Sequence, residues 1–176
     1  MRFLNSAAAM AIAMAMPVAA CAAAPTAVPA PLTDIEIATI QQLCQTVSLQ
    51  YALYLDAKDY EHLPSVFAED GVWEVLGNKM EGRAAIRDYW KRRTADWTPT
   101  HGRLHQISNQ VIDVIDRDNA RGTSKVVIYF FDTAQGVKQK LVPTLIAQNN
   151  DEFVRTADGW KLKHRRIESI ALGTAE

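Results

Sequence analysis

The stretch VIDVIDRDNARGTSKVVIYFF, residues 111–131, decides the fold class. Both of its ends are rich in β-branched and aromatic residues, and Asp118-Asn119 between them is typical of a turn, so the stretch predicts two antiparallel strands. Further segments with strand composition lie at 141–154 and 160–170, and Asp158-Gly159 forms the turn between them. The second half of the chain therefore predicts a meander of long antiparallel strands.

The residues before this meander have helical patterns. Thr33-Asp-Ile-Glu36 has the form of a capping box, and apolar residues then recur every three to four positions as far as about Ala57. Asp59 is a suitable cap for a short helix through Phe67, Asp70-Gly71 predicts a turn, and residues 83–93 predict another helix. Helices followed by a strand meander indicate an α+β fold whose antiparallel sheet wraps around the N-terminal helices.

Composition limits the number of domains and the class of partner. The chain has 176 residues, of which 48% are hydrophobic, as expected for one domain with a substantial core. The formal net charge is -1. Such a chain has no basic field to attract phosphate backbones, so nucleic acid is not an expected partner.

The first 24 residues have the layout of a secretory signal peptide: Arg2, a short apolar run and then small residues. Residues 25–32 are rich in proline and predict an extended tether, and residues 33–172 are expected to form the folded domain. Val18-Ala-Ala-Cys21 resembles a lipobox, whereas Ala20-Cys-Ala resembles an ordinary cleavage site. We therefore expect an exported, periplasmic protein, and leave open whether it is soluble or anchored to the membrane through a lipid on Cys21.

The only other cysteine is Cys44, which lies in the apolar pattern of the first helix. Because Cys21 is either removed or lipidated, no disulfide is expected. An unpaired cysteine in such a pattern is usually a small buried hydrophobe, so we predict that role for Cys44.

Several stretches together resemble the SnoaL-like family of the nuclear transport factor 2-like superfamily. They are YALYLDAKDY (51–60), VFAEDGVW (66–73), EGRAAI (81–86) and DGWKL (158–162). The resemblance covers Leu32 to about Leu172. It implies a cone-shaped fold in which a strongly curved antiparallel sheet is closed by the N-terminal helices, with a pocket inside.

Within this family the chain resembles the hydro-lyases and dehydrohalogenases, a group that includes scytalone dehydratase, bile-acid 7α-dehydratase and lindane dehydrochlorinase. The resemblance implies catalytic roles for Asp56, at the end of the first helix, and His105. It also implies substrate-binding positions at Tyr51, Trp73 and Arg165. The dehydrochlorinase has a lysine at the position of Tyr51, so its substrate is not carried over.

The second acidic residue of the bile-acid enzyme likewise falls near Ile128 of this chain. Its substrate is therefore not carried over either. The fold hosts several chemistries, so it does not identify the reaction by itself.

Residue chemistry leaves alternatives open at each position. A carboxylate such as Asp56 in the last turn of a helix is disfavoured by the helix dipole, so it needs a partner, and a protonatable histidine would supply one. The alternative is a surface Asp. His62, His101 and His164 compete with His105 and are expected to be solvated.

Each predicted substrate-binding residue also has a structural alternative. Tyr51 and Trp73 could equally be core aromatics. Strict strand alternation from Trp160 places Arg165 on the opposite face of the sheet unless a bulge intervenes. The remaining candidates for lining a pocket are Asn109, Tyr54 and Tyr129.

The leading hypothesis is a cofactor-independent lyase acting on a small apolar molecule, in which His105 abstracts a proton and Asp56 orients it. The sequence has no motif for a metal, a phosphate loop or a cofactor. An isomerase that uses the same two residues is a close alternative. A non-catalytic module for ligand binding or assembly is the alternative from another class. The resemblance also implies a homo-oligomer.

Overall fold

The computed structural model describes residues 30–173. The predicted signal peptide, Cys21 and most of the tether lie outside these residues. The fold is that of the compact unit that begins at Leu32. Its elements are α1 (Asp34–Asp56), a 3-10 turn η1 (Leu63–Val66), β1 (Phe67–Val75), β2 (Asn78–Glu81), α2 (Arg83–Arg93), β3 (His101–Val114), β4 (Asn119–Asp132), a 3-10 turn η2 (Thr133–Gln135), β5 (Leu145–Thr156) and β6 (Gly159–Leu172).

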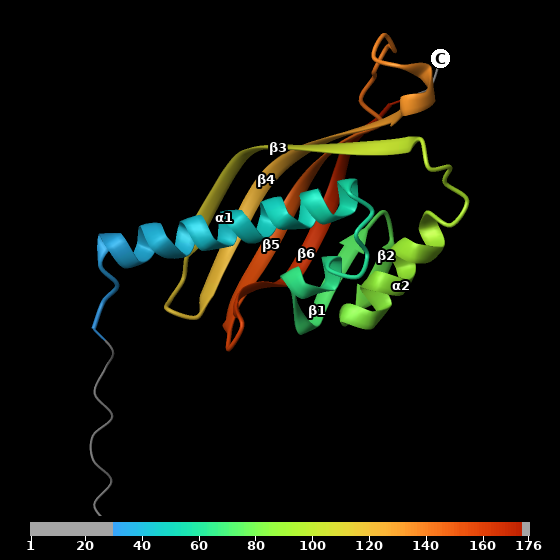
Figure 1. Cartoon of the computed structure of the whole chain (residues 1–176). Helices are drawn as coiled ribbons and strands as arrows, with labels where there is room; N and C mark the ends of the chain where they lie inside the picture. Colours follow the sequence, from blue (N-terminus) through green and yellow to red (C-terminus); the bar gives the residue numbers. More distant parts are fainter. Residues whose placement is uncertain (1–29, 174–176) are drawn as a thin grey trace, which may run out of the picture. The chain divides into compact units, whose positions relative to one another are not determined.

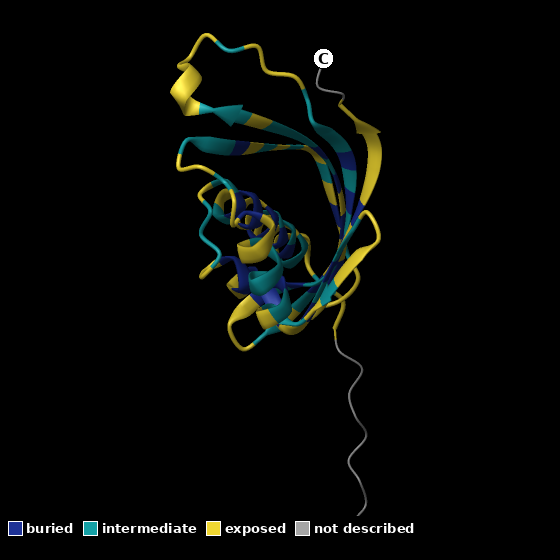
Figure 2. Cartoon of the chain, turned by 90° about the vertical axis from the view of Figure 1, so that its right-hand side faces the viewer, coloured by how far each residue is buried: buried dark blue, intermediate teal, exposed yellow. Residues whose placement is uncertain are grey.

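The strands form one sheet in the order β2-β1-β6-β5-β4-β3, and α1 lies along its concave side (Figure 1). The view in Figure 2 shows the sheet curving around the helices. The predicted α+β class with a curved sheet is confirmed. The sheet is mixed rather than wholly antiparallel, because β1 pairs in parallel with β6. These two strands are not joined by a hairpin, so no tight turn imposes opposite directions on them.

Helix α1 supplies one wall of the core. The predicted capping box is present: the Thr33 hydroxyl accepts the Glu36 backbone N–H at 3.2 Å, and the Glu36 carboxylate accepts the Thr33 backbone N–H at 2.8 Å. The buried residues recur at helical spacing and include Cys44, whose thiol pKa is raised to about 12 by burial. Cys44 is the buried hydrophobe that the sequence predicts, and it is not a reactive thiolate.

The segment between α1 and α2 differs from its sequence prediction. The helix expected to run through Phe67 is only the short turn η1, and the turn expected at Asp70-Gly71 lies inside β1. The pairing of β1 with β6 shifts register between Phe67 and Val72. A Cβ on Gly71 would lie 2.9 Å from the Ala68 carbonyl oxygen of the same strand and 3.0 Å from the Leu162 carbonyl oxygen of β6. Glycine therefore permits this irregular strand to approach its neighbour, which is a role distinct from turn formation.

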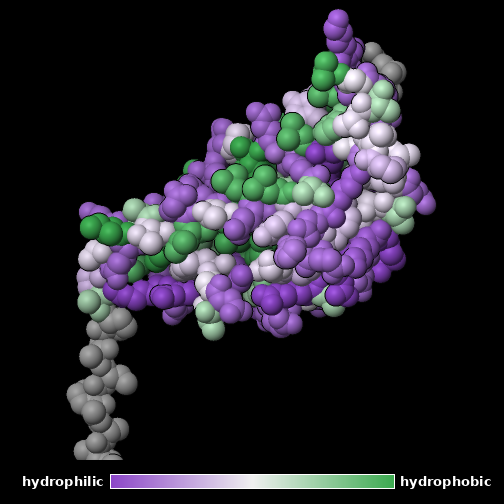
Figure 3. Space-filling model, in the orientation of Figure 1, coloured by the Kyte–Doolittle hydropathy of each residue, from purple (hydrophilic) through white to green (hydrophobic). Residues whose placement is uncertain are grey.

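Exposed apolar side chains lie on α1 and on the edge strand β3. Figure 3 shows apolar surface gathered along these elements, whereas the surface over α2 is mainly hydrophilic.

Within residues 30–173, none of the helices combines the length and the hydrophobicity needed to span a bilayer.

Candidate active site

The end of α1 meets the start of β3 through a carboxylate and an imidazole. Oδ1 of Asp56 lies 2.6 Å from Nδ1 of His105, and Oδ2 accepts the His105 backbone N–H at 2.9 Å. The side chains are largely buried, with 20% of Asp56 and 6% of His105 exposed. Two contacts to one residue fix the ring and the carboxylate relative to each other. The structure thus brings together the two residues predicted to be catalytic.

This contact also determines which nitrogen of His105 is basic. A carboxylate only accepts hydrogen bonds, so Nδ1 carries the proton and Nε2 keeps its lone pair. Burial lowers the pKa of His105 below its usual value, and this effect outweighs the opposing influence of Asp56, while the cations Arg103 and Arg165 lower the pKa further. At neutral pH the ring is therefore uncharged, which is the state required of a general base.

Tyr51 and Trp73 form a hydrogen-bonded pair beside this histidine. The Trp73 indole N–H donates to the Tyr51 hydroxyl oxygen at 2.7 Å, and both side chains are buried. Burial raises the pKa of Tyr51 to about 12, although the nearby Arg165 and the hydrogen bond from Trp73 act in the opposite direction. Tyr51 therefore keeps its proton. Because its oxygen already accepts from Trp73, the hydroxyl can donate that proton to a ligand.

A bulge in β6 decides the direction of Arg165. Glu152 pairs with His164 and Phe153 pairs with Leu162, so Lys163 is an extra residue without a partner in β5. The bulge reverses the alternation after Leu162 and turns Arg165 to the buried face that Trp160 also occupies.

The Arg165 guanidinium is fully buried in a polar network. It donates to both carboxylate oxygens of Asp151, at 2.8 and 2.7 Å, and to the Ser48 hydroxyl at 2.9 Å. Burial opposes its charge, but Asp151 outweighs burial and the pKa of Arg165 is raised. The guanidinium carbon lies 4.3 Å from the ring centre of Tyr51. Arg165 thus packs against the ring of Tyr51. Its role in substrate binding remains a prediction.

A cavity of about 230 Å³ opens in front of Tyr51 and His105. This volume lies just below the range of about 300–1,000 Å³ that is typical of ligand sites, which indicates a small ligand. Most of its wall is apolar or aromatic. The aromatic side chains in the wall are Tyr51, Trp73, Tyr89, Trp90, Trp97 and Phe130. Ile128, near which the resemblance places the second acidic residue of the bile-acid enzyme, also lies in the wall.

Arg103 is a cavity residue that the sequence analysis missed. It lies two positions before His105 on the same face of β3, and its guanidinium is within 5.1 Å of the ring centres of Trp90 and Trp97. One nitrogen, Nη2, donates to the carbonyl oxygen of Leu55 at the end of α1. The signal that could have found it is the two-residue period of a strand, which places residues 103 and 105 on one side.

The three competing histidines do not line this cavity. His62 is exposed and its Nδ1 lies 2.7 Å from Oδ2 of Asp59, and Nε2 of His164 lies 3.0 Å from Oε2 of Glu74. The expectation that His101 is solvated is wrong. Its ring stacks on Trp97 with 4.2 Å between ring centres, and its Nε2 is buried without a hydrogen-bond partner.

The three further residues considered as liners also lie elsewhere. Tyr54 stacks against His62, and Asn109 is exposed, with a φ of 48° where β3 shifts register against β4. Tyr129 lies between two lining residues of β4, Ile128 and Phe130, so strand alternation turns it to the other side.

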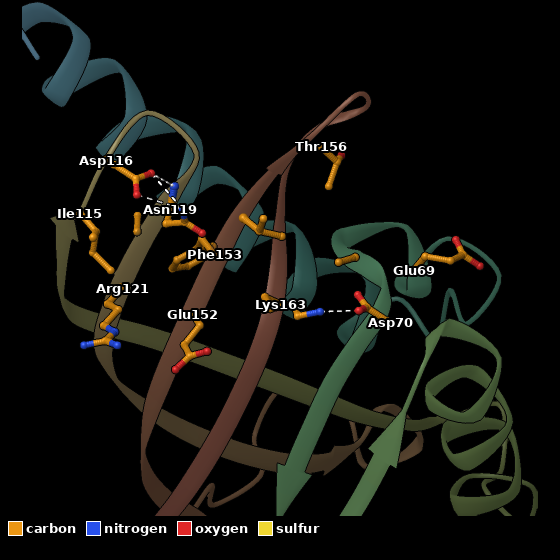
Figure 4. Close-up of a pocket in the computed structure, with 13 residues that line it drawn as sticks. Glu69, Asp70, Ile115, Asp116, Asn119, Arg121, Glu152, Phe153, Thr156 and Lys163 are labelled. Atoms are coloured by element: carbon orange, nitrogen blue, oxygen red, sulfur yellow. Dashed lines mark hydrogen bonds and ion pairs between the residues drawn. The ribbon is translucent and has the colours of Figure 1, made fainter. Parts of the chain in front are cut away.

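A larger hollow of about 590 Å³ lies elsewhere, near the β3–β4 and β5–β6 turns (Figure 4). It includes none of the five predicted site residues. Several of its polar groups pair with one another: Asp116 accepts from Asn119, and Lys163 donates to Asp70. The smaller cavity is the better candidate, because the buried imidazole of His105 and the buried hydroxyl of Tyr51 line it. Residues 30–173 contain no group of three or more His, Cys, Asp or Glu side chains placed to hold a metal.

Comparison with known proteins agrees with this architecture. Residues 36–166 match the model of the SnoaL-like domain. A candidate scytalone dehydratase from Novosphingobium aromaticivorans superposes with a TM-score of 0.69 and 19% identity, covering 82% of this chain and 93% of that one.

Two further solved structures are similar. ActVI-ORFA from Streptomyces coelicolor gives a TM-score of 0.65 at 18% identity, covering 75% and 98% of the two chains. An NTF2-like protein with a cystatin-like fold from Novosphingobium aromaticivorans gives 0.64 at 22%, covering 80% and 88%. No curated protein matches the sequence. The family match over residues 36–166 shows that this chain belongs to the SnoaL-like family.

Proposed function

We propose that the chain is a cofactor-independent lyase, of the dehydratase or dehydrohalogenase type, for a small and largely apolar molecule. The observation that carries this proposal is the 2.6 Å contact between Asp56 and His105 at the wall of an aromatic cavity. A buried, neutral imidazole with one nitrogen held by a carboxylate is poised to take a proton.

In the proposed reaction, Nε2 of His105 removes a proton from a carbon of the substrate. The electrons of that C–H bond form a carbon–carbon double bond, and the leaving group departs from the adjacent carbon with its bonding electrons. Asp56 orients the ring and stabilises the imidazolium that forms. Tyr51 donates a hydrogen bond to the leaving group. A hydroxide recovers the proton to leave as water, whereas a halide leaves as the anion.

An isomerase would use the same base but return the proton to a different carbon, and a binding module would leave the ligand unchanged. A panel of metabolites incubated with the protein in D₂O separates these classes by NMR. A lyase gives an unsaturated product, an isomerase gives a shifted double bond with deuterium incorporated, and a module gives neither. A panel in which ligands bind the cavity without any exchange or product contradicts the proposed lyase.

The pH profile of kcat/KM is expected to have a single acidic limb. His105 acts only when neutral and its pKa is lowered, so kcat/KM falls as the pH drops through a midpoint below 6.5. Deprotonation of Tyr51 does not limit the rate until about pH 12. Asp56→Asn removes the influence that raises the His105 pKa, so the limb should move to lower pH while the plateau falls. A midpoint above 6.5, or a limb unmoved in Asp56→Asn, would contradict these roles.

The same shift makes the fold less stable in acid. Unfolded His105 binds a proton more readily than the folded residue, so the free energy of unfolding decreases as the pH falls below 6.5 towards the folded pKa.

We also propose that the protein is exported and self-associates. The signal pattern in residues 1–24 supports export to a periplasm, with release or lipid anchoring at Cys21. Mass spectrometry of the mature N-terminus separates these two outcomes, and light scattering of the purified domain measures the oligomeric state.

A further inference from the structure

Two buried N–H groups in the cavity wall have no hydrogen-bond partner. They are Nε of Arg103 and Nε1 of Trp90, both on residues that line the cavity in front of His105. An unpaired buried donor destabilises the folded protein, and more so when it is charged, so native proteins rarely keep one without a partner. The two side chains are in contact, with the guanidinium carbon 4.8 Å from the centre of the Trp90 ring.

The charges around this point favour an anion. Arg103 is 4% exposed, and the nearest carboxylate oxygen, Oδ1 of Asp56, is 3.9 Å from Nε, which is an ion pair but not a hydrogen bond. Both oxygens of that carboxylate already accept from His105. Arg93 adds a second positive charge to the cavity wall. The residues that line the cavity include no acid, so with His105 neutral the charged groups of the wall are Arg103 and Arg93, and Asp56 lies beside them as the partner of His105.

We propose that Arg103 and Trp90 form a subsite for the carboxylate of the ligand, so that the substrate class is small aromatic or alicyclic carboxylic acids. The statement that this ligand is a substrate rests on the proposed function, whereas the binding of a carboxylate does not. Arg103 Nε and Trp90 Nε1 supply two donors, and the aromatic wall supplies surface for an apolar ring. The subsite lies close to His105, because Oδ1 of Asp56 is 3.9 Å from Arg103 Nε and 2.6 Å from His105 Nδ1. A bound acid would thus present its C–H bonds near His105.

Calorimetric titration of the mature protein with matched pairs of acids and amides tests the subsite. The probes are benzoate, phenylacetate and trans-cinnamate, each compared with its own amide, which has almost the same shape but no charge. At least one acid should bind about tenfold or more tightly than its amide, because a hydrogen bond to a charged group contributes about 1.5–3 kcal/mol. Added salt should weaken the binding of the acid and leave the binding of the amide unchanged.

Variants assign the preference to the two donors. Trp90→Phe keeps an aromatic ring but removes the N–H, and Arg103→Lys keeps the charge but removes Nε. Each should lower the preference for the acid several-fold. The matched control is Arg92→Gln, which removes a charge from the same helix as Arg93 at an exposed position outside the cavity wall, and should leave the preference unchanged. If circular dichroism shows that Arg103→Lys does not fold, the acid preference of Trp90→Phe still tests the subsite.

The outcomes separate this inference from the proposed reaction. Binding of acids that persists in His105→Ala supports the subsite whether or not the wild-type protein turns any ligand over. Equal affinity for acids and amides overturns the subsite, as does a preference unchanged in Trp90→Phe and Arg103→Lys. Failure of every acid to bind the folded protein also overturns it.

Discussion

Replacing His105 with Ala is expected to lower kcat/KM for the substrate by about 10²–10⁴-fold, the usual contribution of a positioned general base. The variant should still fold, because the ring is one wall of a cavity and the main sheet contacts of β3 are made by its backbone. Asp56→Asn should lower kcat/KM as well, since an amide at this position no longer stabilises the imidazolium. Circular dichroism checks the fold, and product formation by NMR gives the rate.

His62 provides the matched control for this experiment. It forms a histidine–aspartate pair of the same kind, with 2.7 Å between Nδ1 and Oδ2 of Asp59, but its side chain is 71% exposed. His62→Ala should therefore leave kcat/KM unchanged. Turnover by His105→Ala at the wild-type rate would refute the mechanism, because it would show that a histidine bonded to a carboxylate is not the base.

The second large effect is expected on stability, at the buried ion pair beneath Tyr51. Asp151→Ala leaves the fully buried Arg165 without its counter-ion, and breaking such a pair typically costs about 3–5 kcal/mol. The loss is a large part of the total stability of about 5–15 kcal/mol that a domain usually has. Urea denaturation followed by tryptophan fluorescence measures it. A change of less than about 1 kcal/mol would contradict the proposed dependence of Arg165 on Asp151.

The control is the ion pair between Lys163 and Asp70, two residues away from Arg165 along β6. Both of its side chains are exposed, so Asp70→Ala should leave the urea midpoint nearly unchanged. If Asp151→Ala does not fold, the double variant Asp151→Leu with Arg165→Met removes both charges together. It should recover most of the stability, since well-packed apolar residues can replace a buried pair.

The order of the elements could be predicted because the sequence patterns are local. A capping box at Thr33, helical spacing of apolar residues and the turn at Asp158-Gly159 each depend on a few neighbouring residues. The parallel pairing of β1 with β6 could not be predicted, because it depends on which strands meet after the sheet has curved. The role of Gly71 depends on the same strand pairing. Asp70-Gly71 is typical of a turn, but Gly71 lies within β1, where nearby carbonyl oxygens leave no room for a side chain.

The candidate site was likewise predictable only in part. Asp56 and His105 were identified through the family resemblance, and the structure places them within hydrogen-bond distance. Strand alternation places Arg103 on the same face as His105, but neither composition nor resemblance distinguishes it from the other arginines. Its contacts with Trp90 and Trp97 could not be predicted, because these two residues lie on α2 and on the loop after it, far from β3 in the sequence. The orientation of Arg165 depends on one bulged residue, which strict alternation does not predict.

The bulge at Lys163 places two consecutive arginines under different evolutionary constraints. Arg166 is more than half exposed and pairs with Glu168 at the surface, so it is free to drift during divergence. Arg165 shares its burial with Asp151 and Ser48, and a change at any of the three leaves the others with unmet charge or hydrogen bonds. These three positions are therefore expected to covary among descendants of this sequence. A gapless alignment that ignores the extra residue would compare the wrong arginine.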